Sequence, residues 1–397
     1  MKQWGWVVIL ALAALPAWCA KKVTVGELAD ALASMHKENK SDADVAGALK
    51  QLELTEELTR NTMNSLVANV PGPLSTEQIY VLEARSAMLA PPPSDIPTSA
   101  APDAAAQKAM LDKTADYVTK TYGQLPALTA TRTTIRFQDN VEAAAPSSGM
   151  HGSATDVSTG TAFVSAYQFI HYINSTDSQV TSDHGAERMP SDKDKTPWGA
   201  NKMIALQEPD PSLAAVFQEA QGAGDIKWLR WEMVNGKQAA VYAFDIPKKK
   251  AHFAVSVCCF PDVSQTGVAT FQSASAGSAH GSGGGGAKGN FQTNTDWSNY
   301  KANVPYHGEF FIDPDTGIVV RMITEAELRP TEIVHQVDER IDYAPVTAGG
   351  KTLVLPIKSI INTEVVPNGD SGAAGKFSIR RTLFTSEYKD YHFPGAS

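Results

Sequence analysis

The stretch that decides the fold is Tyr306–Ile323, which reads YHGEFFIDPDTGIVVRMI. Two strand-like runs flank a loop in which Pro314 presets φ at the start of the turn. Asp313 can accept a backbone N–H from inside the loop, and Gly317 can take the left-handed conformation that leads into the second strand. The stretch therefore predicts a β-hairpin.

Both faces of this predicted hairpin are largely apolar. The pairing expected for a four-residue loop is Asp313 with Ile318, Ile312 with Val319, and Phe311 with Val320. One face then carries Phe311, Val320 and Met322, and the other carries Phe310, Ile312 and Val319. An antiparallel sheet that is bare to water on one side alternates more cleanly. We therefore expect a helix, a curved sheet or a ligand to cover the second face.

The remaining strand-like segments extend the hairpin into a meander. Asn235-Gly236 is a strong hairpin turn between Trp228–Val234 and Gln238–Ile246. The segment Thr331–Tyr343 alternates between an apolar set and a polar set. The apolar set is Ile333, Val337, Ile341 and Tyr343, and the polar set is Glu332, Gln336, Asp338, Arg340 and Asp342. Short connections of this kind predict an α+β fold, an antiparallel, curved, unclosed β-barrel of roughly ten strands with packed helices.

Four short amphipathic helices are predicted before this sheet. Their start signals are the capping box of Thr24 and Glu27, then Ser41, then Thr55, and finally the capping box of Ser75 and Gln78. Helices of this length bury their apolar faces against one another, so residues 21–90 are expected to form a small helical bundle. A segment rich in proline, serine and alanine, 91–102, reads as a linker, and a longer helix over Asp103–Tyr122 follows it.

The domain plan that follows has a targeting segment at 1–20, the bundle, the linker, and a half-barrel domain over 103–397. Two stretches near 139–160 and 261–303 lack a regular pattern and are expected to be flexible insertions. The second contains four consecutive glycines. It is not a phosphate-binding loop, because no Gly-Lys-Ser/Thr sequence follows to open a helix.

The first twenty residues have the pattern of a signal peptide. Lys2 supplies a positive start, Trp4–Ala17 is an apolar run, and Ala20 is a plausible cleavage residue. Trp18 precedes Cys19 where a lipoprotein signal has a small residue, so export without a lipid is expected. No second candidate transmembrane segment follows. The predicted location is therefore periplasmic or secreted.

Composition narrows the function classes further. The chain of 397 residues has a net charge of −9 and 43% hydrophobic residues. An acidic chain without a Lys/Arg stripe cannot neutralise phosphates, which argues against nucleic acid as a partner. After cleavage, the cysteines that remain are Cys258 and Cys259. A bond between such neighbours needs a strained ring, so no structural disulfide is expected.

The sequence contains no recognisable set of catalytic or metal-binding residues. The histidines are scattered, and none has ligand spacing with a carboxylate partner. The sequence therefore predicts no catalytic residue, no metal ligand and no cofactor. It favours a protein that is not an enzyme. The candidate ligand-binding surface is an apolar face of the sheet, made of Phe137, Phe311, Val320, Ile333, Val337 and Ile341.

The order of these elements resembles a known family. The segment Ala106–Phe137, the hairpin from Tyr306, and the closing strand ending Tyr388–Tyr391 resemble the periplasmic lipoprotein-carrier (LolA-like) half-barrel family over roughly 103–391. Phrases such as Trp228–Glu232 and Leu353–Pro356 also resemble uncharacterised exported proteins of soil bacteria. The carrier resemblance implies an unclosed barrel whose apolar concave face can hold acyl chains, without catalytic residues.

Three functions remain open at this point. The first is an exported, non-catalytic envelope protein that binds an apolar or lipid-like ligand in a concave sheet. The second is a protein-interaction module in which the helical bundle contacts an envelope partner and the sheet is a scaffold. The third is an unrecognised hydrolase. A continuous apolar concavity favours the first, an exposed apolar patch on the bundle the second, and a cleft with convergent Asp, Glu or His the third.

Overall fold

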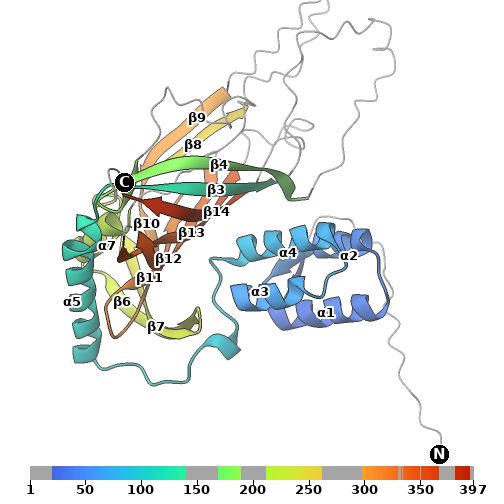
Figure 1. The fold of residues 1–397 in the computed structure, drawn as a ribbon, viewed down its shortest axis with the longest axis horizontal. Helices are drawn as coiled ribbons and strands as arrows, with labels where there is room; N and C mark the ends of the chain where they lie inside the picture. Colours follow the sequence, from blue (N-terminus) through green and yellow to red (C-terminus); the bar gives the residue numbers. More distant parts are fainter. Residues whose placement is uncertain are drawn as a thin grey trace, which may run out of the picture.

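A large antiparallel sheet is the centre of the fold. The computed structural model describes residues 20–139, 169–188, 212–261, 297–329, 332, 334–348, 350–365 and 381–393. Within this part of the chain, ten strands form one sheet in the order β5-β4-β3-β14-β13-β12-β11-β10-β7-β6 (Figure 1). Their bounds are β3 Leu128–Gln138, β4 His171–Asp183, β5 Ala186–Arg188, β6 Ile226–Val234, β7 Lys237–Ile246, β10 Tyr306–Ile312, β11 Val319–Ala326, β12 Val334–Ala348, β13 Lys351–Val365 and β14 Arg381–His392. The sheet is not closed into a barrel, which confirms the predicted α+β fold class.

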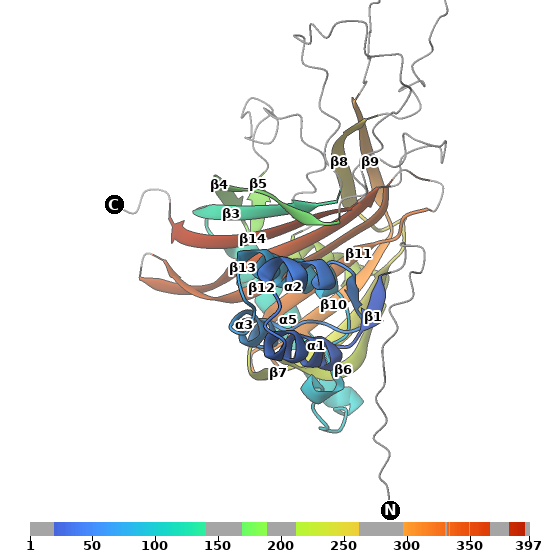
Figure 2. The same cartoon turned by 90° about the vertical axis from the view of Figure 1, so that its right-hand side faces the viewer.

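Helices cover both faces of this sheet. The helices α5 (Ala104–Lys120) and α7 (Leu213–Ala223) pack on one side, which we call the inner face. The small bundle lies on the other side, the outer face, as Figures 1 and 2 show. Its helices are α1 Val25–Lys37, α2 Asp42–Leu49, α3 Arg60–Val67 and α4 Pro73–Ser86. The second cover that the apolar hairpin required is therefore supplied by the chain itself.

The turn of the organising hairpin has the predicted chemistry. Asp313 Oδ1 accepts the backbone N–H groups of Asp315 at 2.9 Å and Thr316 at 3.0 Å. Gly317 has a φ of 75°, and the Asp313 N–H donates to the Ile318 carbonyl at 2.9 Å. The loop therefore closes as a four-residue connection.

The predicted register fails one residue after the turn. Ile312 pairs with Val319 as expected, but Phe311 pairs with Arg321, since a β-bulge at this point leaves Val320 without a cross-strand position. The bulge places Met322 opposite Phe310 and in the same inner core, whereas the sequence analysis had grouped Met322 with Phe311. A single extra residue reverses the alternation of everything beyond it.

The start signals of the helical bundle are confirmed in two of four cases. Thr24 and Glu27 form the predicted capping box, and the Ser41 side chain caps α2. The helix α3 starts after Thr59 rather than Thr55, and the first helical residue of α4 is Pro73, so the expected Ser75 cap is wrong. The free N–H groups of Leu74 and Ser75 are instead satisfied by the carboxylate of Asp42, 32 and 33 residues away, at 3.0 and 2.9 Å.

Several strands lie in segments for which no strand was predicted. The strands β1 (Lys21–Val23) and β2 (Leu52–Leu54) pair in parallel beside the bundle, within the segment that was expected to be helical. The strand β4 is rich in polar residues. The strand β9 (Trp297–Val304) pairs with β8 (Phe253–Pro261) and takes up the end of the expected insertion at 261–303. Short or polar strands carry too weak an alternation to be recognised alone.

Some predictions fall on residues that the structure does not describe. They include the signal peptide at 1–19 and most of the two insertions. Cys258 and Cys259 lie in β8, as the strand assignment expected. No helix in the described part of the chain is long and apolar enough to cross a membrane.

Candidate functional site

A cavity lies on the inner face, between one half of the sheet and the start of α7. Its volume is about 70 Å³, enough for roughly five water molecules. The residues around it are Tyr122, Leu125, Ala130, Val180, Ser182, Gly185, Ala186, Glu187, Ser212, Leu213, Ile341, Tyr343, Leu355, Pro356, Tyr388 and Tyr391. This cavity is the candidate ligand site.

The cavity also shows how strongly the sheet curves. Glu187 on β5 and Ile341 on β12 both line it, although five strand spacings separate these strands. In a flat sheet that separation is roughly 24 Å. One small cavity can touch both strands only if the sheet curves around it, so the inner face is the concave face.

Four tyrosines line the cavity, and three of them make hydrogen bonds that hold their rings in place. The Tyr122 hydroxyl donates to the Gly185 carbonyl at 3.0 Å, and the Tyr391 hydroxyl donates to the Pro356 carbonyl at 2.6 Å. The Tyr388 hydroxyl lies 3.3 Å from Glu187 Oε2 and donates to it. Each of these phenols is anchored to the protein, so their rings form fixed walls.

The turn between β4 and β5 is built to fit one of these rings. Gly185 has a φ of 74°, and a Cβ placed on it would lie 2.3 Å from a ring carbon of Tyr122. A larger residue at this position would displace the tyrosine that closes this end of the cavity. This turn was not predicted, because His184-Gly185 is not one of the usual hairpin dipeptides, although both residues adopt positive φ values of 53° and 74°.

The titratable groups of the cavity favour binding over proton transfer. Burial raises the pKa of Tyr122, Tyr388 and Tyr391, so these phenols stay neutral at physiological pH. Glu187 is held by Arg132, whose Nη1 lies 2.5 Å from Glu187 Oε1. The arrangement therefore offers an apolar enclosure with a few fixed hydrogen-bonding groups.

The structure does not bring the six predicted ligand-binding residues together. Val337 and Ile341 lie in the core of the inner face, and Ile341 lines the cavity. Phe311 and Val320 pack on the outer face with Val241 and Ile323. The predicted single apolar face is therefore wrong, because its described members divide between the two faces of the sheet. The alternation of each strand shows which residues share a face, but not which face of one strand continues the same face of another.

The last two of the six residues complete this account. Phe137 lies on the outer face, where it packs with Val81 and Ala84 of α4. Ile333 lies outside the described residues. Three of the five described candidates, Phe137, Phe311 and Val320, therefore lie on the outer face, which is the face opposite to the cavity.

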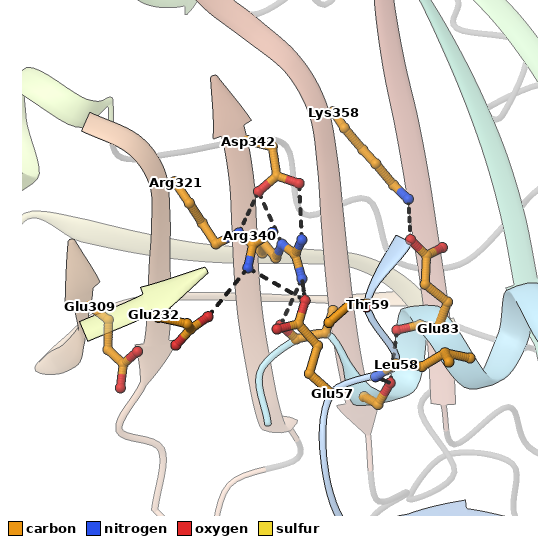
Figure 3. Close-up of polar contacts among 12 residues, drawn as sticks. Glu57, Leu58, Thr59, Glu83, Glu232, Glu309, Arg321, Arg340, Asp342 and Lys358 are labelled. Atoms are coloured by element: carbon orange, nitrogen blue, oxygen red, sulfur yellow. Dashed lines mark hydrogen bonds and ion pairs between the residues drawn. The ribbon is translucent and has the colours of Figure 1, made fainter. Parts of the chain in front are cut away.

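A cluster of buried charges joins the bundle to the outer face (Figure 3). It consists of Glu57, Arg230, Glu232, Glu309, Arg321, Arg340 and Asp342, and we call it the interface ionic cluster. Glu57, in the segment between β2 and α3, receives Arg340 Nη1 at 2.5 Å and Arg321 Nη1 at 3.4 Å. Asp342 lies 2.6 Å from Arg321 Nε and 3.0 Å from Arg340 Nη2.

The cluster continues along the sheet to its far edge. Arg230 on β6 binds Glu232 at 2.6 Å and Glu309 on β10 at 2.8 Å. Glu232 is also 3.8 Å from Arg321 on β11. The Phe311 ring packs among these groups, with the guanidinium carbons of Arg321 and Arg230 at 5.3 and 5.9 Å from its centre.

Burial affects the carboxyls of the cluster differently. Burial raises the pKa of Glu232 to about 7, and Arg230 and Arg321 reduce this shift only in part. Burial also acts to raise the pKa of Asp342, but its two arginine partners outweigh burial and hold that pKa well below its usual range. Asp342 is therefore ionised under all physiological conditions, whereas Glu232 titrates near neutral pH.

The C-terminal end of α4 docks on donors from the sheet. The last carbonyls of a helix have no partner within it and form the negative end of its dipole. Asn362 Nδ2 donates to the Ala84 carbonyl at 3.1 Å, and Arg340 Nη1 donates to the Ala87 carbonyl at 3.2 Å. Lys358 Nζ binds Glu83 at 2.5 Å. These contacts orient the bundle on the outer face.

The signal for this interface was present in the sequence. Asp338, Arg340 and Asp342 alternate with apolar residues along β12. The pattern of one strand does not distinguish a solvated polar face from a buried ionic one, because both place charges at every second residue.

We also searched for a metal site among the described residues and for similar proteins. Within the described residues, no group of three or more His, Cys, Asp and Glu side chains is placed to hold a metal ion. Comparisons with protein-family models, with curated proteins and with solved structures find no match to this chain.

Proposed function

We propose that this chain is an exported, non-catalytic binding protein that holds the apolar part of a small lipid-like ligand in the cavity of the concave face. The observation that carries the proposal is the cavity itself, enclosed by strands from β5 to β12 and by Leu213 at the start of α7. The signal-peptide pattern at the N-terminus supports a periplasmic or secreted location. The half-barrel resemblance points to the same class of ligand.

The volume of the cavity limits what it can hold. A space of about 70 Å³ suits a short apolar group, such as the end of an acyl chain, and not a whole lipid. Its apolar walls include Ala130, Val180 and Leu355, and the tyrosine hydroxyls lie among them. This composition suits an amphipathic molecule whose apolar end enters and whose polar end stays near the rim.

A cavity-filling variant tests the proposal. Ala130 is 2% exposed and lines the cavity, so Ala130→Leu puts an isobutyl group into the free space. Binding is measured by isothermal titration calorimetry of decanoic acid, whose chain ends in a free methyl group, into the full chain. We expect saturable binding to the unmodified protein and at least tenfold weaker binding to Ala130→Leu, with its thermal unfolding temperature retained.

The matched control adds the same side chain on the surface. Ala105 is exposed on α5, so Ala105→Leu should leave binding of the probe unchanged. Equal binding to Ala130→Leu and to the unmodified protein would contradict the proposal, as would the absence of saturable binding to either.

A further inference from the structure

A second pocket lies between the bundle and the outer face, so the sheet separates it from the cavity of the inner face. Its volume is about 200 Å³. Residues of β2, α4 and the strands β12, β13 and β14 surround it, and they are Glu53, Leu54, Leu82, Arg85, Ser86, Leu89, Gln336, Asn362, Thr363, Arg381 and Leu383. Leucines form its apolar walls, while two arginines, a glutamate and two amides supply its polar groups.

Two buried side chains of this pocket, Asn362 and Thr363, each have a polar atom without a hydrogen-bond partner among the described residues. Asn362 is 7% exposed, and its Nδ2 donates to the Ala84 carbonyl at 3.1 Å. That bond fixes the orientation of the amide, and Asn362 Oδ1 then has no hydrogen-bond partner among the described residues. A buried unpaired acceptor is unfavourable, so a group that donates a hydrogen bond would be stabilised beside it.

The arginines of the pocket provide the complementary half of a recognition site. Arg85 on α4 donates from Nη1 to the Leu52 carbonyl at 3.4 Å. Arg381 on β14 binds Glu364 through Nε at 3.0 Å, and its side chain is 43% exposed, which places it at the mouth. A guanidinium group carries five N–H donors in one plane, and planar donors of this kind recognise carboxylates.

We propose that this pocket binds a small amino acid-like molecule with an apolar side chain. Its carboxylate binds Arg85 and Arg381, its ammonium group donates to Asn362 Oδ1, and its side chain packs against Leu54, Leu82 and Leu383. Such a ligand contacts the bundle and the sheet at once. It therefore stabilises the docked arrangement and raises the unfolding temperature of the whole chain.

Three probes of one shape test the chemistry. L-leucine has both groups, leucinamide lacks the carboxylate, and 4-methylpentanoate lacks the ammonium group. Binding to the full chain is measured by isothermal titration calorimetry and by the shift in thermal unfolding temperature. We expect L-leucine to bind and the other two probes to bind at least tenfold more weakly. Equal binding of all three probes would contradict the proposal, because recognition would then rest on the shared apolar side chain alone. Binding of none would also contradict it and leave a pocket that holds water only.

A blocking variant locates the binding. Leu89 lines the pocket and is 38% exposed, so Leu89→Trp fills the mouth without removing a buried group. Leu74 on α4 is 50% exposed and lies outside the residues that line the pocket, so Leu74→Trp is the matched control. The first variant should lose L-leucine and the second should retain it. Retention in both would overturn the assignment. Binding of decanoic acid should be the same in both variants, which separates this site from the concave cavity.

Discussion

Arg340 on β12 binds Glu57 of the helical bundle, with Nη1 2.5 Å from Oε1, although 283 residues separate the two in sequence. Both side chains are buried, at 8% and 4% exposure. A buried ion pair adds little net stability compared with apolar residues, because both charges lose their hydration. The pair instead fixes where the bundle sits, since any other position leaves buried charges without partners.

Removing one partner of this pair is expected to be costly. Glu57→Ala leaves Arg340 and Arg321 short of a buried counter-charge, which should lower the free energy of unfolding by about 3 kcal/mol or more. Urea unfolding followed by tryptophan fluorescence measures the change. Asp112→Ala is the control, because Lys108–Asp112 is an exposed pair worth at most about 1 kcal/mol. A loss as small as the control's would mean that Glu57 does not hold the bundle.

The stability of the protein should fall as pH rises towards 8. Burial raises the pKa of Glu232 to about 7 and that of Asp338 to about 7, above their values of 4.5 and 3.8 in an unfolded chain. The folded state therefore binds more protons than the unfolded state between about pH 4 and 7. The free energy of unfolding decreases across that window as pH increases.

A neutral variant isolates the contribution of Glu232. Glu232→Gln cannot ionise, so its free energy of unfolding should depend less on pH between 5 and 8 than that of the unmodified protein. Urea unfolding at four pH values measures both slopes. Identical slopes would show that Glu232 titrates at its ordinary pKa in the folded protein.

Gly317 should tolerate substitution less well than a glycine of the same conformation elsewhere. Gly317 and Gly224 both have a φ of 75°, so alanine is strained at either position. A Cβ on Gly317 would also lie 2.6 Å from the Cβ of Lys113 on α5, whereas a Cβ on Gly224 meets nothing within 4 Å. Gly317→Ala should therefore lower the thermal unfolding temperature further than Gly224→Ala. Equal effects would mean that α5 does not pack against the hairpin turn.

The two phenylalanines of the organising hairpin should both be essential to the fold. Phe310 stacks on Phe244 with ring centres 4.4 Å apart, and Phe311 is 1% exposed on the other face. Phe310→Ala and Phe311→Ala should each lower the free energy of unfolding by about 3–5 kcal/mol in urea unfolding. A much smaller loss at either position would place that ring at an open surface or at a ligand.

Local signals in the sequence predicted much of the fold. The loop from Asp313 to Gly317 and the turn at Asn235-Gly236 are determined by neighbouring residues, and both have the expected positive φ values. The capping box of Thr24 is likewise local. These elements could be predicted because the interactions that form them lie within four residues.

The features that were predicted wrongly depend on contacts between residues that are distant in the sequence. The carboxylate of Asp42 caps α4 from another helix, and no pattern near Ser75 records that contact. The bulge at Val320 shifts the register of β11 against β10, and the pattern of the hairpin does not record it. The apolar set of the candidate site is divided between two faces, because the pattern of one strand does not show which of its faces meets the inner core. The cavity itself needs the curvature of six strands, which no single segment encodes.

The measurement that tests the proposed function most directly is native mass spectrometry of the protein after gentle extraction from the envelope. The proposal predicts a species heavier than the chain by the mass of a lipid-like molecule, which is absent from Ala130→Leu and present in Ala105→Leu. A protein that shows only the mass of the chain, both after extraction and after incubation with decanoic acid, would contradict it.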